Sequence, residues 1–107
     1  MTLKVVVFAS CREGKVDRLR ELVKWASSEI KATEPDVSHY EVFVADGEKD
    51  GIKEGVVYMH ITDEEALVRR RQLKHHLEFA AIVEKEGLLE TPIRYLILKD
   101  VVDEWHR

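Results

Sequence analysis

The sequence predicts an α+β fold in which a four-stranded antiparallel sheet carries two helices on one face. The first observation is the order of strand-like and helix-like runs, which is strand, helix, strand, strand, helix, strand. The second is a charged stretch with three glycines between the two middle strands, which favours an antiparallel hairpin. With right-handed crossovers, this order gives the ferredoxin-like βαββαβ arrangement.

The first half of the chain supplies a strand, a helix and a second strand. Residues 3–9 (LKVVVFA) are apolar and β-branched, as in a strand buried on both faces. Residues 15–33 have the spacing of an amphipathic helix, and Pro35 ends it. The apolar stripe of that helix consists of Val16, Leu19, Val23, Ala26 and Ile30. Residues 37–45 (VSHYEVFVA) alternate as in a strand with two different faces.

The second half begins with the glycine-containing loop at residues 46–55 (DGEKDGIKEG). Residues 56–61 (VVYMHI) are apolar enough to form the third strand, and residues 93–101 (IRYLILKDV) the last one. Residues 103–107 (DEWHR) form a short C-terminal tail. We expect residues 1–107 to form one domain, because a chain of 107 residues has the size of one.

Residues 62–87 are expected to form the second long helix, and they carry the only adjacent histidine pair. Thr62 and Glu65 fit a capping box at its start, and Gly87 fits a stop signal. At about 100° per residue, His76 falls beside the inner face and His75 points outward. A continuous helix would place the following residues on its inner face: Ala66, Arg70, Leu73, Leu77, Ala80 and Ala81.

Apolar side chains occupy both faces of the first and last strands. In the first strand Val5 and Val7 point to one side, and Val6 and Phe8 to the other. Two helices cover only one face, and a large exposed apolar patch marks an interaction surface. We therefore expect a homodimer that packs sheet against sheet. The pattern does not say which face meets the partner.

The amino-acid composition limits which kinds of partner and which cellular compartment are expected. The hydrophobic fraction of 45% supports a core, and the charged fraction of 36% supports a water-exposed surface. A net charge of −4 argues against nucleic acid, and no apolar run is long enough for a membrane helix. Cys11 is the only cysteine, so no intrachain disulfide forms. We expect a cytoplasmic protein, with a cysteine-poor secreted protein as the alternative.

No motif for a metal, a nucleotide or a covalent nucleophile is present. Adjacent histidines on a helix point about 100° apart and do not chelate one ion together. The chain has neither an H-x-x-x-H spacing nor a glycine-rich phosphate loop, and Cys11 has no histidine nearby in sequence. We therefore expect no cofactor and no metal.

Three stretches resemble the antibiotic biosynthesis monooxygenase (ABM) family of dimeric α+β barrels. They are residues 8–30 (FASCREGKVDRLRELVKWASSEI), residues 34–43 (EPDVSHYEVF) and residues 56–79 (VVYMHITDEEALVRRRQLKHHLEF). The resemblance implies a homodimer with a cavity between sheet and helices in each subunit. It implies oxidation of an aromatic or polyketide-like molecule by O2 without a cofactor. Relatives in this group include haem-degrading enzymes and small-molecule isomerases.

The chain departs from the family pattern at several positions. Family members commonly have E-P-G where this chain has Glu34-Pro35-Asp36. They commonly carry a glutamate after the aromatic residue of the third strand, where His60 stands nearby here. Of two histidines that are frequent in the second helix, the first corresponds to Arg70 and the second to His75 or His76. Relatives often bend this helix just before the histidine, and a bend there would rotate His75 and His76 relative to the inner face. The chain has no asparagine. Haem-degrading relatives, and some quinone-forming ones, use an asparagine side chain in the site. Its absence therefore argues against both activities, and more strongly against haem degradation.

The candidate catalytic residues are His76 and Arg70. His76 would act as a general base or as a hydrogen-bond donor to a substrate oxygen, and the plainer alternative is a partly exposed residue on the helix flank. Arg70 would stabilise an anion, or its side chain would extend to the rim of the fold. Candidate substrate-binding residues are Trp25, Tyr40, Tyr58 and His60, although the aromatic ones are also plausible packing residues and His60 is equally suited to the dimer interface.

Two classes of function follow. The first is a cofactor-independent monooxygenase acting on a small aromatic or polyketide-like molecule. An electron-rich phenolate or enolate reduces O2 itself, so the protein has only to remove a proton, enclose the substrate and stabilise the anion. The alternative is a non-catalytic small-molecule-binding protein of the same fold, or an isomerase or haem-degrading relative. An apolar cavity of roughly 300 Å³ or more with convergent polar groups would favour the monooxygenase, and a closed, fully packed cavity with both histidines outside it would favour the binding protein.

Overall fold

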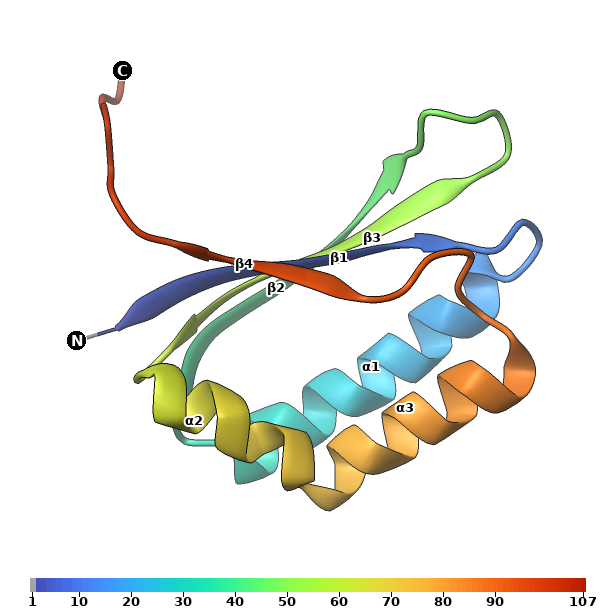
Figure 1. Ribbon diagram of the computed structural model, residues 1–107, viewed down its shortest axis with the longest axis horizontal. Helices are drawn as coiled ribbons and strands as arrows, with labels where there is room; N and C mark the ends of the chain where they lie inside the picture. The colour runs from blue at the N-terminus through green and yellow to red at the C-terminus, as the bar shows by residue number, and fades with distance from the viewer. Residues whose placement is uncertain (1) are drawn as a thin grey trace.

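The computed structural model describes residues 2–107 and has the predicted order of elements (Figure 1). In chain order the elements are β1 (Leu3–Cys11), α1 (Val16–Thr33), β2 (Val37–Asp46), β3 (Lys53–Ile61), α2 (Glu64–Arg69), the 3-10 turn η1 (Arg70–Gln72), α3 (Lys74–Glu86) and β4 (Arg94–Leu98). The middle strands reach further into the hairpin than predicted, so that its loop spans only residues 47–52. The last strand is shorter than predicted, because pairing stops at Leu98.

The four strands form one antiparallel sheet in the order β2-β3-β1-β4. In the register of the central strands, Val5 lies opposite Met59 on β3 and Ile97 on β4. All helices cover the same face of the sheet (Figure 1). The α+β ferredoxin-like fold predicted from the sequence is therefore confirmed.

The core lies between the sheet and the helices in two clusters. One joins the sheet to α2 through Val5, Met59, Ile61, Ala66 and Leu67. The other joins α1 to the end of α3 through Leu22, Val83 and Leu88. Burial of one large aliphatic side chain contributes about 1.5–3 kcal/mol, so these clusters fix the helices on the sheet.

The second long helix is not continuous, and its start is one residue later than predicted. Asp63, rather than Thr62, is the N-cap, because its carboxylate accepts a hydrogen bond of 2.8 Å from the backbone N–H of Ala66. The Thr62 hydroxyl instead donates to the carbonyl oxygen of Asp36, at 3.2 Å. The predicted stop is confirmed, since Gly87 adopts φ 60° in the left-handed region.

The helical segment is interrupted at Leu73, whose backbone is extended at φ −70° and ψ 143°. An extended residue restarts the helix with a different phase, so the inner face predicted for a continuous helix is wrong beyond this point. Leu77 is 53% exposed, whereas His75 and Val83 are buried. The predicted inner residues that prove to be exposed are Leu73, Leu77, Ala80 and Ala81.

The sheet face turned away from the helices, here called the open face, is uncovered and carries both apolar and polar side chains. The alternation of β1 places Val6 and Phe8 there, and pairing adds Val56 from β3 and Leu96 from β4. Leu96 is 55% exposed. Beyond β4 the chain leaves the body as an extended tail (Figure 1). Among residues 2–107, no helix combines the length and apolar character needed to cross a membrane.

Candidate active site

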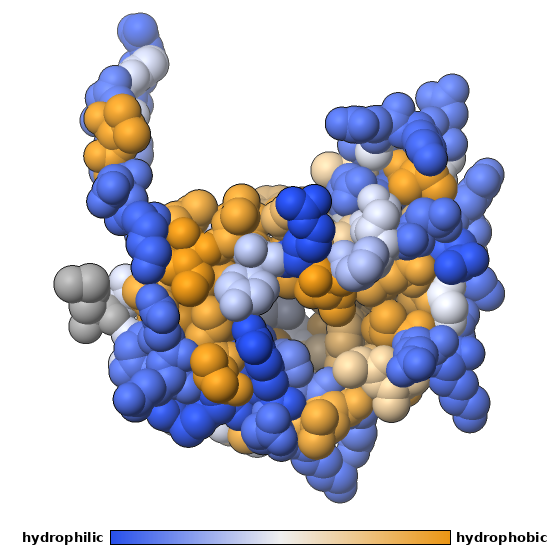
Figure 2. Space-filling view, in the orientation of Figure 1, coloured by the Kyte–Doolittle hydropathy of each residue, from blue (hydrophilic) through white to orange (hydrophobic). Residues whose placement is uncertain are grey.

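A cavity of about 190 Å³ lies between the sheet and the helices. It is here called the sheet–helix cavity, and the surface is hollowed between these two layers in Figure 2. Its apolar walls include Val7 and Val57 from the sheet, and Ile30 and Phe79 from the helices. Its polar groups are Tyr40, Arg70, Arg71, His75, His76 and Tyr95. Apolar walls with a few convergent polar groups are typical of a small-molecule site.

Glu34 connects the polar groups, although it follows the last residue of α1. Its side chain is almost fully buried. Its carboxylate accepts hydrogen bonds from Arg70 Nε at 2.8 Å and from His75 Nε2 at 2.6 Å. Burial alone would raise the pKa of Glu34, but the hydrogen bonds and charges of Arg70 and His75 outweigh this effect and lower it. The carboxylate is therefore ionised at neutral pH.

His75 is held by Glu34 in one tautomer. An ionised carboxylate only accepts hydrogen bonds, so His75 Nε2 carries a proton in this contact, and in the neutral ring Nδ1 then carries the lone pair. Among the side chains of residues 2–107, no buried nitrogen or oxygen lacks a hydrogen-bond partner. Since the side-chain hydrogen bond of His75 runs through Nε2, its Nδ1 atom is not fully buried. A carboxylate that orients a histidine with a free ring nitrogen is the arrangement of a general base.

His76 faces the same cavity with different chemistry. Its Nε2 lies 3.3 Å from Arg70 Nη1, and a guanidinium only donates, so Nε2 accepts and Nδ1 carries the proton. Burial lowers the pKa of His76, and the charge of Arg70 lowers it further. The ring is therefore neutral at pH 7 and presents an N–H donor rather than a free lone pair.

The expectation that His75 points to solvent is wrong. The side chain is 9% exposed, and both histidines line the cavity. The break at Leu73 rotates the start of α3, so that the adjacent rings enter the cavity from two directions.

Of the other candidates, Tyr40 is in the cavity and three residues are not. Burial raises the pKa of Tyr40, so its hydroxyl stays protonated. Trp25 packs beside the cluster of Leu22, Val83 and Leu88. Tyr58 and His60 lie on the open face, where the tyrosine oxygen is 3.0 Å from His60 Nε2. Burial lowers the pKa of His60, and the charges of His39 and Lys4 add to this effect.

Sequence reasoning missed Glu34, Tyr95 and Arg71. Glu34 carried a signal, because an acidic side chain at the C-terminal end of a helix opposes the helix dipole unless it has a partner. The alternation of the last strand puts Tyr95 on the same side as Ile93 and Ile97, but it does not say which side faces the helices. Arg71 belongs to a run of three arginines, residues 69–71, whose simplest interpretation from the sequence is a solvated helix turn.

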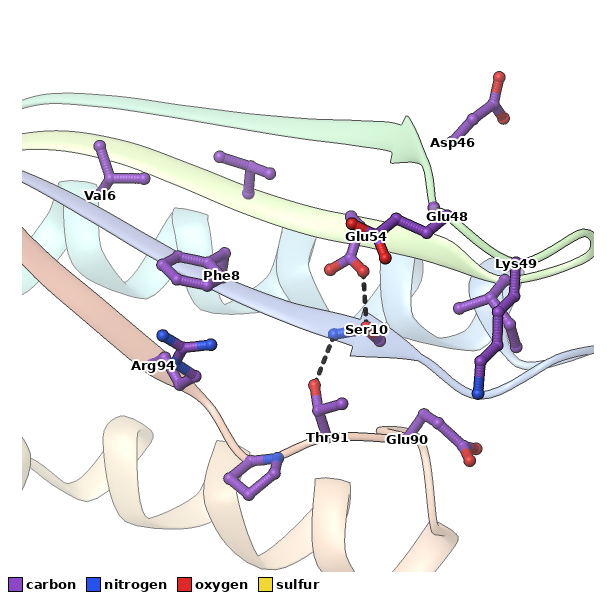
Figure 3. Close-up of a pocket in the computed structure, with 14 residues that line it drawn as sticks. Val6, Phe8, Ser10, Asp46, Glu48, Lys49, Glu54, Glu90, Thr91 and Arg94 are labelled. Carbon is purple, nitrogen blue, oxygen red and sulfur yellow. Dashed lines mark hydrogen bonds between the residues drawn. The ribbon is translucent and has the colours of Figure 1, made fainter.

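A second hollow of about 790 Å³ lies on the open face, between the β2–β3 hairpin and the connector to β4 (Figure 3). Ser10 lies at its base, donating through Oγ to Glu54 at 2.6 Å and through its backbone N–H to Thr91 Oγ1 at 2.9 Å. Arg94 lies over the Phe8 ring, 5.1 Å from its centroid. This hollow is lined by carboxylates but by no histidine, whereas both His75 and His76 line the sheet–helix cavity.

Neither a metal cluster nor an activated thiol is found in the described part of the chain. No group of three histidine, cysteine or acidic side chains within residues 2–107 is placed to hold a metal ion. Cys11 is buried as a free thiol, and burial raises its pKa, which keeps it protonated.

Comparison with known proteins identifies the fold. No family model matches the sequence, and neither does any curated protein. Among solved structures, the protein Rv0793 of Mycobacterium tuberculosis is 20% identical with a TM-score of 0.74, over 96% of this chain and 98% of that one. The protein PA3566 of Pseudomonas aeruginosa is 17% identical with a TM-score of 0.74, over 94% and 95% of the two chains.

The description of a third similar solved structure names an activity. It is described as an antibiotic biosynthesis monooxygenase and is 17% identical with a TM-score of 0.74, over 92% of this chain and 98% of that one. At this level of identity the similarity is one of fold. The chain therefore has the fold of the antibiotic biosynthesis monooxygenases, as the sequence resemblance implied.

Proposed function

We propose that residues 1–107 form one domain of the ABM family, and that it is a cofactor-independent monooxygenase acting on a small aromatic molecule in the sheet–helix cavity. The observation that carries the proposal is the Glu34–His75 pair at the wall of an apolar cavity. The solved structure named as an antibiotic biosynthesis monooxygenase supports the class of reaction.

The size of the cavity favours a substrate with one ring. An apolar cavity of about 150 Å³ is large enough to bind benzene. The sheet–helix cavity holds about 190 Å³, which accommodates a substituted single ring. The volume lies below the range of about 300–1,000 Å³ found for drug-sized ligands. We therefore narrow the substrate class to monocyclic phenols.

The polar groups have separate roles in the proposed reaction. His75 Nδ1 accepts the phenolic proton, and Glu34 stabilises the imidazolium that results. The phenolate reduces O2, while the Nδ1–H of His76 donates to the charged oxygen. One atom of O2 replaces the hydrogen at the attacked ring carbon to give a quinone, and the other leaves as water with the two hydrogens that the phenol loses. The oxidation is complete without a further reductant.

We also propose that two copies pack open face against open face. The apolar side chains there include Phe43, 47% exposed, and Leu96, 55% exposed. An uncovered apolar patch of this kind is typical of an obligate interface. The resemblance to dimeric α+β barrels supports the same arrangement. The single, buried free thiol of Cys11 fits a cytoplasmic location.

Oxygen labelling tests the proposed reaction. The protein is incubated with electron-rich phenols under 18O2, and oxygen uptake is recorded together with the mass of the product. A monooxygenase places one 18O atom in the quinone and consumes one O2 per product. Uptake that yields hydrogen peroxide without label in the product indicates an oxidase, and this outcome contradicts the proposal.

A non-catalytic binding protein is the second candidate. The observation that favours it is that Glu34, Arg70, His75 and His76 already bond to one another, so the network is satisfied without a substrate. In that case monocyclic phenols bind in the sheet–helix cavity, but no oxygen is consumed with any of them.

A further inference from the structure

Three consecutive arginines differ in how their charges are compensated. Arg69 forms ion pairs with Asp36 at 3.2 Å and with Glu65 at 3.9 Å. Arg70 pairs with Glu34 at 2.8 Å. Arg71 forms no ion pair with any carboxylate of residues 2–107. A guanidinium without an acidic partner is available to bind an anion.

Arg71 lies at the sheet–helix cavity. Its side chain lines the cavity, and its guanidinium carbon lies 5.3 Å from the centroid of the Tyr95 ring, which lines the cavity too. A cation over an aromatic face is attracted to it, so Tyr95 holds the guanidinium at this position. Arg71 is nevertheless solvent-exposed, which places it at the mouth.

The charges at the cavity leave one positive charge uncompensated. Arg70 and Arg71 are the only lining residues with a permanent charge. Glu34 neutralises Arg70, and the lowered pKa of His76 keeps its ring uncharged. A neutral phenol forms no ion pair with Arg71. A ligand that carries a negative charge does.

We propose that Arg71 is a specificity-determining residue that binds a carboxylate on the substrate, so that the substrate class is a hydroxybenzoate rather than a neutral phenol. The inference rests on the proposed function only in taking the sheet–helix cavity as the substrate site. The planar guanidinium matches a carboxylate with two parallel hydrogen bonds. The volume of about 190 Å³ leaves room for one ring between Arg71 at the mouth and His75 at the wall.

Calorimetric titration with two matched probes tests this assignment. The probes are 4-hydroxybenzoate and 4-hydroxybenzyl alcohol, which share the ring and the phenol but differ in charge. We expect the wild type to bind the acid about tenfold more tightly, because hydrogen bonds to charged groups contribute about that factor. Arg71→Gln should remove the preference, and Arg71→Lys should restore part of it. The matched control Arg69→Gln, one residue from the cavity lining, should keep it.

Three results overturn the assignment: no binding of either probe to the wild type, equal binding of both, or a preference that survives in Arg71→Gln. The result of this binding test can be distinguished from the result of the oxygen-labelling test. An Arg71-dependent preference without oxygen consumption keeps the binding role and removes the monooxygenase. Oxidation of neutral phenols without any Arg71-dependent preference removes only the binding role.

Discussion

Glu34 Oε2 lies 2.6 Å from His75 Nε2, and this contact joins the end of α1 to the start of α3. The same carboxylate pairs with Arg70 on the 3-10 turn between α2 and α3. One buried acid therefore holds two polar residues of the cavity in place. The candidate site depends on this carboxylate for both its geometry and its charge balance.

Glu34→Ala should lower the free energy of unfolding by about 3–5 kcal/mol, because it leaves Arg70 buried without its counter-charge. Urea unfolding followed by circular dichroism measures the change. Glu86→Ala is the control, since Glu86 pairs with Arg18 at the surface and its loss should matter much less. Equal losses in the two variants would show that the Glu34 pair has no special structural role.

The stability of the wild type should fall between about pH 7.5 and pH 5.5, partly because of His76. Its pKa is lowered from 6.5 in the folded protein, so the unfolded chain binds more protons as the pH falls through that value. His76→Gln removes this contribution, and its stability should change less over the same interval. The pKa of Glu34 is lowered from 4.5, so its contribution is lost only at lower pH. The urea midpoints of the wild type and of His76→Gln are measured at both pH values. Equal losses of stability in the two proteins would show that His76 makes no such contribution.

Asp63→Ala should destabilise the protein by about 1 kcal/mol, because the Asp63 carboxylate caps the first free N–H groups of α2. Thr62→Ala should cost less, since its hydroxyl donates to Asp36 in an exposed contact and caps no helix. Thermal unfolding of the two variants distinguishes them. A larger loss for Thr62→Ala would restore the capping box expected from the sequence.

Val6→Asp should convert the proposed dimer to a folded monomer, because Val6 points to the open face. Sedimentation equilibrium at micromolar concentration should give twice the chain mass for the wild type and the chain mass for the variant. Val42→Asp is the matched control, since Val42 is 37% exposed but points to the helix side of the sheet. A wild type that sediments as a monomer would rule out packing through the open face.

The fold was predictable because each element has its own local signal. The apolar stripe of α1 and the stop at Gly87 both survive in the structure, whereas the exposure of side chains along β2 does not alternate. The break at Leu73 has no such signal, since neither glycine nor proline marks it. The phase of α3 changes at this break, because Leu73 is extended.

The site was predictable only in part, for the same reason. Arg70, Tyr40 and His76 were expected in the cavity and line it. His75 was placed outside because a continuous helix was assumed. Glu34 is far from the histidines in sequence, so only the folded chain shows that it contacts His75.

Oxygen uptake by His75→Asn on electron-rich monocyclic phenols tests the central claim most directly, namely that the Glu34–His75 pair removes the substrate proton. Loss of a general base typically lowers the rate about 10²–10⁴-fold. We predict a fall of that size relative to the wild type, with binding of the same phenol retained as proof that the cavity is intact. Equal rates of oxygen uptake in the two proteins would contradict the claim and exclude His75 as the base.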